Sequence, residues 1–111
     1  MTPPFHVEPD PARVVEVPAA GTLSRTMHQD DDVKVVVFGF AQGEELSEHT
    51  ASRPALIQVL SGELELTLGG KTVHAGTGSW IHMSAGLRHA VLALSPSVML
   101  LTLVRRGAPA E

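Results

Sequence analysis

The sequence contains no cysteine, which excludes disulfide bonds, thiolate metal ligands and a cysteine nucleophile. It contains no asparagine either, so N-linked glycosylation has no acceptor. No apolar run approaches the roughly 20 residues that cross a membrane as a helix. The N-terminal segment has prolines at positions 3, 4, 9 and 11 and lacks the apolar core of a secretory signal. We therefore expect no membrane association, no secretion and a cytoplasmic location.

Positive charge is also scarce. There are 8 Lys and Arg residues against 12 Asp and Glu residues, which gives a net charge of −4, and no window is strongly basic. A nucleic-acid partner therefore has no electrostatic support. Hydrophobic residues make up 43% and charged residues 18% of the 111 residues, a composition typical of one globular domain rather than of a disordered chain.

The chain contains a series of short β-strand patterns and no segment with helical periodicity. Leu64, Leu66 and Leu68 alternate with polar residues, which indicates a strand with one buried face, and Gly69-Gly70 suits a two-residue hairpin turn. Turn signals recur every eight to twelve residues or so, as in β-sandwiches and barrels. We expect about eight strands, the clearest of them at residues 33–40, 55–60, 64–68, 71–76, 79–83, 89–94 and 97–104.

Three segments follow from this pattern. Residues 1–20 are a proline-rich arm, residues 21–105 are the all-β domain, and residues 106–111 are a tail. The acidic run at 29–32 lacks the alternating spacing of a calcium loop and is interpreted as a solvated hairpin turn.

Two strands are apolar on both faces and therefore need cover on both sides. In 33–40, Val35 and Val37 share one face while Phe38 and Phe40 share the other, and 97–104 has the same two-sided character. The second cover is either a partner subunit or the N-terminal arm. We favour a homodimer formed through strands 33–40 and 97–104.

Six histidines are the obvious candidates for chemistry. For His6, His28 and His74 the ordinary interpretation of a surface or hydrogen-bonded side chain is preferred. His49 and His89 differ, because each lies at the junction of a turn and a strand within a glycine-punctuated stretch.

The stretch around His49 has a regular spacing. Gly43 precedes His49 by six positions, Ala51 and Ala55 follow, and Gly62 closes the stretch. This resembles the first motif of the cupin superfamily, in which the positions of Ala51 and Ala55 carry a second histidine and a glutamate.

The stretch around His89 matches the second cupin motif. Gly78, Ser84, Gly86, His89 and Ala93 stand where that motif has glycine, proline, glycine, histidine and asparagine. The resemblance covers about residues 21–104 and implies a small double-stranded β-helix, or jelly-roll barrel, of the single-domain bacterial type.

The resemblance also implies a metal site that this chain has only in part. Of the four family ligand positions, His49 and His89 keep a donor, whereas Ala51 and Ala55 have none. Catalytic zinc usually has three protein ligands, and non-haem iron has two histidines and a carboxylate. His82 is a weak candidate for a third ligand. We expect a degenerate site that binds Zn, Fe, Ni or Mn weakly, or no metal.

The resemblance places an apolar pocket beside the two imidazoles. We expect its lining to include Ala51, Ala55, Ile57, Val59, Trp80 and Met83. Such a pocket suits a small, partly apolar ligand. Two alternatives stay open at this point: a metal-dependent enzyme with dioxygenase, isomerase or lyase chemistry that uses a further ligand, and a structural or interaction protein without an active pocket.

Overall fold

The computed structural model describes residues 3–106, and most of the predicted tail lies outside this range. The all-β prediction is confirmed: the described chain forms nine strands and a single-turn 3-10 helix. No described helix has the length and apolarity needed to span a membrane. The elements are η1 (Pro11–Arg13), β1 (Thr22–Gln29), β2 (Val33–Phe40), β3 (Glu45–His49), β4 (Ala55–Ser61), β5 (Glu63–Leu68), β6 (Lys71–Gly76), β7 (Trp80–Met83), β8 (His89–Ala93) and β9 (Ser97–Val104).

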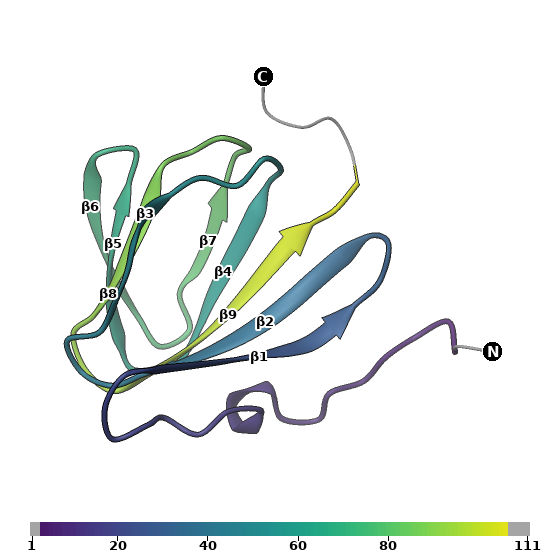
Figure 1. Cartoon of the computed structure of the whole chain (residues 1–111), viewed down its shortest axis with the longest axis horizontal. Coiled ribbons are helices and arrows are strands. Elements are labelled where there is room, and N and C mark those ends of the chain that lie inside the picture. Colours follow the sequence, from purple (N-terminus) through teal and green to yellow (C-terminus); the bar gives the residue numbers. More distant parts are fainter. Residues whose placement is uncertain (1–2, 107–111) are drawn as a thin grey trace.

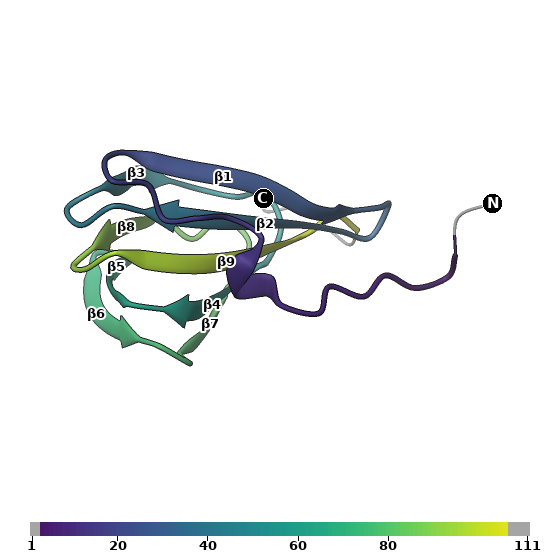
Figure 2. The same cartoon turned by 90° about the horizontal axis from the view of Figure 1, so that it is seen from below.

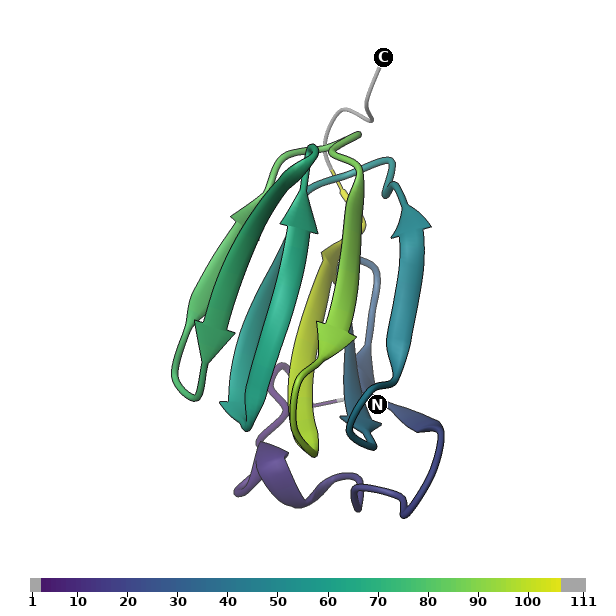
Figure 3. The ribbon, with the colours of Figure 1, turned by 90° about the vertical axis from the view of Figure 1, so that its left-hand side faces the viewer.

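The strands form two antiparallel sheets that face each other, as expected for a double-stranded β-helix (Figure 1). One sheet has five strands in the order β1-β2-β9-β4-β7, and the other has four in the order β3-β8-β5-β6. Figure 3 shows the molecule with the four-stranded sheet toward the viewer. The Gly69-Gly70 hairpin is confirmed, because Leu68 pairs with Lys71 across it and both glycines have positive φ.

The inner faces of the two sheets form one apolar core. Ile57 and Val59 of β4 alternate with the exposed Gln58 and are 1% exposed, and Leu64 and Leu66 from the opposite sheet are fully buried. These side chains pack in one cluster, so the middle of the barrel is filled by protein.

β1 and β3 were not among the strands predicted by pattern. Most of their side chains are exposed, so neither segment has the apolar alternation on which the prediction depends. Both segments are nevertheless paired along their length, β1 with β2 and β3 with β8.

The outer face of the five-stranded sheet is covered by the N-terminal arm. Val37 and Val98 point outward, away from the core cluster, yet they are 0% and 4% exposed. A Cβ atom added at Gly39 would lie 3.1 Å from the carbonyl oxygen of Glu16, which shows how closely the arm approaches. Figure 2 shows the arm in front of this sheet. The arm therefore supplies cover that we had expected from a partner subunit, and the homodimer stays a prediction.

Candidate functional site

The structure brings His49 and His89 together at one end of the barrel. The two residues lie opposite each other on β3 and β8, and their ring centroids are 4.1 Å apart with an interplanar angle of 61°. His89 is 5% exposed, whereas His49 lies on the exposed rim. The first and second motifs thus meet in space at their histidines.

A β-bulge aims His49 into the barrel. Leu46 pairs with Val91 and His49 pairs with His89, so β3 has one more residue than β8 between these two pairs. Paired residues of an antiparallel ladder share a face, and Val91 belongs to the core. Strict alternation from Leu46 would have placed Glu48 inward, and the bulge turns His49 inward instead.

Both imidazoles are held in the same tautomer. Nδ1 of His49 donates to the carbonyl oxygen of Ser47 at 2.8 Å, and Nδ1 of His89 donates to that of Leu87 at 3.0 Å. A carbonyl oxygen can only accept, so each Nδ1 carries the proton. In the neutral form, each Nε2 therefore has a lone pair free for a ligand.

His82, the weak candidate for a third ligand, does not join this pair. In β7, Ile81 pairs with the inward-facing Ile57, so His82 and Trp80 point to the outer face of the sheet. His82 is exposed there, and Trp80 is 63% exposed. The expectations that His82 is a weak ligand candidate and that Trp80 lines the pocket are therefore wrong, since a side chain on the outer face cannot reach the interior.

The inner-face residues at the end of the barrel where the imidazoles lie are apolar. Ala55 and Met83 pair with each other on the inner face of the five-stranded sheet and are almost fully buried, and Leu103 pairs with Ala55 from β9. From the other sheet, Leu68 pairs with His89. Leu68 and Leu103 are only partly buried against the core cluster. We call this end of the barrel, where His49 and His89 lie, the mouth.

Below the mouth, the described side chains form the packed core. Ile57 and Val59 were expected to line the pocket, but at 1% exposure they are packed core residues. The ligand-accessible part is therefore the mouth and its rim. A hollow of about 400 Å³ lies near this end, and its lining includes the predicted pocket residue Ala51 but neither imidazole. The lining residues are Ala51, Ser52, Arg53, Leu103, Val104 and Arg105.

Hydrogen bonds between loops fix the rim of the mouth. The amide of Gly86 donates to the carbonyl oxygen of Ala51, and the amide of Gly69 donates to that of Arg88, each at 2.8 Å. These bonds tie together the loops at 50–54, 69–70 and 84–88, which lie at one end of the barrel (Figure 1). The site is thus positioned by ordered backbone rather than by side chains alone.

The comparisons with known proteins agree with this architecture. Residues 36–104 match the family described as Cupin domain. The chain belongs to the cupin family. No curated protein matches it.

Several solved cupin-fold structures are similar to the chain along most of its length. A conserved protein of unknown function from Streptococcus pyogenes, SPY1581, is 30% identical with a TM-score of 0.82, and the match covers 97% of this chain and 93% of that one. A cupin superfamily protein from Desulfitobacterium hafniense is 25% identical with a TM-score of 0.83 and coverages of 92% and 94%. KdgF from Halomonas sp. is 22% identical with a TM-score of 0.73 and coverages of 78% and 81%, a likeness that extends to the fold alone.

The donor set of this cupin does not fit a tightly held catalytic metal. The described residues contain no group of three or more His, Cys, Asp or Glu side chains that could hold a metal ion. Ala51 and Ala55 stand where the cupin resemblance implies donors, and His82 faces outward. Two imidazoles alone fall short of the three protein ligands typical of catalytic zinc.

The sequence interpretation missed the leucines of the mouth. Leu68 lies beside His89, and a Cβ atom added at Gly69 would lie 3.1 Å from Cδ1 of Leu87. The alternation of Leu64, Leu66 and Leu68 already placed Leu68 on an inner face. The register that sets it beside His89 depends on long-range pairing, which no local pattern contains.

Proposed function

We propose that this cupin binds a small, partly apolar molecule at the barrel mouth, with the Nε2 atoms of His49 and His89 as its polar partners and without a tightly held metal. The observation that carries the proposal is the pair of imidazoles, 4.1 Å apart, each with its Nδ1 proton held by a backbone carbonyl. Two preset acceptors at one site suit a ligand with a polar head.

The apolar surroundings define the rest of the ligand. Leu68 pairs with His89, and in the opposite sheet Leu103 pairs with Ala55, which is small where the cupin resemblance implies a glutamate. An apolar body of a few carbon atoms would lie against these side chains, while its polar group donates a hydrogen bond to Nε2. A cytoplasmic location stays a prediction from the N-terminal sequence alone.

Thermal-shift screening with small metabolites tests the proposal. A ligand at ten times its Kd stabilises the folded state by about 1.4 kcal/mol, which raises the Tm by about 5 °C in a domain of this size. We expect such shifts for molecules that combine one polar group with a short apolar chain. The shift should disappear in His49→Gln and His89→Gln.

His82→Gln is the matched control, because it removes an exposed histidine from the outer face of the same barrel. It should keep the full ligand-induced shift. If His49→Gln and His89→Gln keep the shift as well, or if His82→Gln loses it, the ligand binds elsewhere and the proposed site is wrong. If no compound in a broad metabolite set stabilises the wild-type protein, the interaction-protein alternative becomes the better account.

A further inference from the structure

The hollow of about 400 Å³ near the mouth has a positively charged lining. It includes two arginines, Arg53 and Arg105, and none of its described lining residues is acidic. Arg53 lies half-buried in the loop between β3 and β4, and Arg105 directly follows β9. In a protein with a net charge of −4, two arginines at one hollow are a local concentration of positive charge.

Hydrogen bonds to the β1–β2 hairpin hold Arg105 in place. Its amide donates to the carbonyl oxygen of Asp32 at 2.8 Å, and its Nη1 donates to that of Asp30 at 2.5 Å. Carbonyl oxygens are neutral acceptors, so these bonds fix the guanidinium without compensating its charge. The carboxylates of Asp31 and Asp32 pair instead with Arg106, at 3.6 Å and 2.6 Å. Arg105 therefore presents its positive charge at the hollow.

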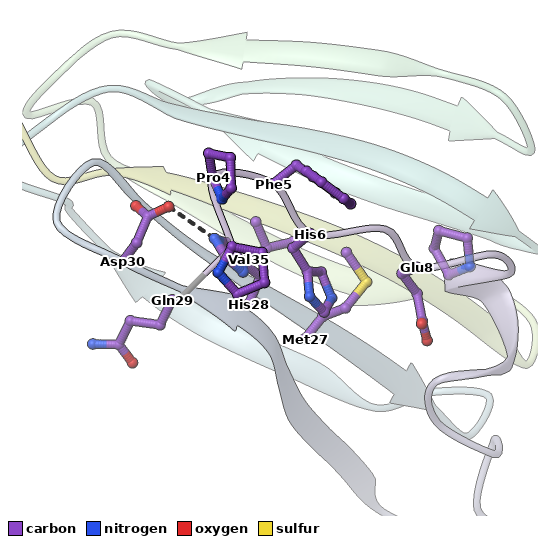
Figure 4. Close-up of a pocket in the computed structure, with 11 residues that line it drawn as sticks. Pro4, Phe5, His6, Glu8, Met27, His28, Gln29, Asp30 and Val35 are labelled. Carbon is purple, nitrogen blue, oxygen red and sulfur yellow. Dashed lines mark hydrogen bonds and ion pairs between the residues drawn. The ribbon is translucent and has the colours of Figure 1, made fainter. Parts of the chain in front are cut away.

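A larger hollow, between the N-terminal arm and the β1–β2 hairpin, has the opposite charge. Its volume is about 740 Å³, and Figure 4 shows Glu8 and Asp30 among the residues that line it, which include no described arginine or lysine. The hydrogen bond from His28, together with those from two backbone amides, holds the pKa of Asp30 at about 2, so its carboxylate is ionised at neutral pH. An anionic ligand is therefore repelled by this hollow and attracted by the one near the mouth.

We propose that the ligand of the mouth carries a carboxylate, which Arg53 and Arg105 bind in the smaller hollow, while a hydroxyl at its other end donates to the imidazoles. This inference rests on the proposed function, because it names the ligand class of the same site. Leu103 joins the two parts, since it lines the hollow and pairs with Ala55 on the inner face. The ligand class is thus a short, flexible hydroxy acid whose carbon chain lies against Leu103.

The chemistry of arginine favours a carboxylate at this place. A guanidinium has five N–H donors in one plane, and a carboxylate can accept two of them in parallel. Arg105 can therefore bind a carboxylate while it keeps its hydrogen bond to the carbonyl oxygen of Asp30. Two guanidinium groups suit the single charge of a carboxylate better than the double charge of a phosphate, which proteins often bind with several backbone amides as well.

NMR titration with three probes of one chain length tests the proposal. Hexanol has only the hydroxyl, hexanoate has only the carboxylate, and ω-hydroxyhexanoate has both. We expect ω-hydroxyhexanoate to bind about 10-fold or more tightly than hexanol, because hydrogen bonds to charged groups are the stronger ones. The amide signals of residues 51–53 and 103–105 should shift when it binds.

Arg53→Gln and Arg105→Gln should each weaken the binding of ω-hydroxyhexanoate by about 10-fold and leave that of hexanol unchanged. A merely structural role of either arginine would weaken the binding of both probes alike. Arg106→Gln is the matched control, because Arg106 lies next to Arg105 but pairs with Asp31 and Asp32. It should leave the affinity for ω-hydroxyhexanoate within about 2-fold of the wild-type value, since exposed ion pairs contribute little.

The inference and the proposed function fail in different ways. If hexanol binds and loses its binding in His49→Gln, but ω-hydroxyhexanoate binds no more tightly than hexanol, the proposed function stands and the carboxylate is wrong. If neither hexanol nor ω-hydroxyhexanoate responds to His49→Gln, the proposed function is wrong, and the hydroxy-acid ligand with it. Unchanged binding of ω-hydroxyhexanoate to Arg53→Gln and Arg105→Gln, or no binding of any of the three probes, overturns the inference as well.

Discussion

Gly62→Ala should lower the free energy of unfolding by about 3–5 kcal/mol, one of the largest effects expected from a single added methyl group. Gly62 has a φ of +92°, which an L-residue adopts at a cost of about 1–2 kcal/mol. Its added Cβ would also lie 2.5 Å from the carbonyl oxygen of Pro96 and 2.8 Å from Cα of Ser97. These are backbone atoms at the start of β9, where Ser97 is buried, so they cannot move aside cheaply.

Gly43→Ala separates the two causes. Gly43 has a φ of +85°, close to that of Gly62, but no atom lies within 4 Å of an added Cβ. It should therefore lose only about 1–2 kcal/mol. Urea denaturation of the two variants and the wild-type protein measures the difference. Equal losses would show that the close packing of Gly62 against the Pro96–Ser97 turn does not contribute.

Ala51→His combined with Ala55→Glu should convert the mouth into a tight metal site. The two substitutions restore the donors implied by the cupin resemblance beside His49 and His89. We expect zinc affinity to rise by about 100-fold or more over the wild-type protein, because the site would then have at least three protein ligands. Titration calorimetry with zinc measures the change.

The same double variant should depend on metal for its stability. Ala55 is 2% exposed, so a glutamate there buries a carboxylate that only a bound cation would compensate. Its Tm should fall below the wild-type value without zinc and recover with zinc by mass action. Adding His49→Ala to the double variant is the control and should abolish most of the gain. If zinc affinity does not rise, the positions of Ala51 and Ala55 do not face the imidazoles.

The glycines of the two motifs explain why the fold could be identified although half the ligands are missing. Gly43, Gly62, Gly78 and Gly86 all have positive φ in the structure. They are needed by the turns between strands, whether or not a metal is bound. The spacing of the motifs therefore predicts the barrel fold. The residues Ala51 and Ala55 determine, independently of the fold, which metal donors are missing.

The orientation of β7 could not be predicted from its own sequence. Trp80 on one face and Ile81 and Met83 on the other are all large and apolar, so periodicity does not show which face is buried. The choice depends on pairing with β4, where Ile57 lies opposite Ile81. The inward orientation of the His49 side chain could not be predicted either, because it depends on a bulge in a strand whose side chains are mostly exposed.

The position of the N-terminal arm could not be predicted from local sequence patterns either. The two-sided apolar character of 33–40 indicated that a second cover exists, and Val37 is indeed buried on the outer face. A proline-rich segment has no periodicity that would identify it as that cover. The structure shows the arm in this place (Figure 2).

The most direct test of the reduced two-imidazole mouth is the metal content of tag-free protein after equilibration with Zn, Fe, Ni and Mn salts and exhaustive dialysis. We predict less than roughly 0.1 metal per chain, because two imidazoles without a third protein ligand hold a divalent ion too weakly to survive dialysis. One metal per chain in the wild-type protein, lost in both His49→Ala and His89→Ala, would contradict the account and favour a metal-dependent enzyme.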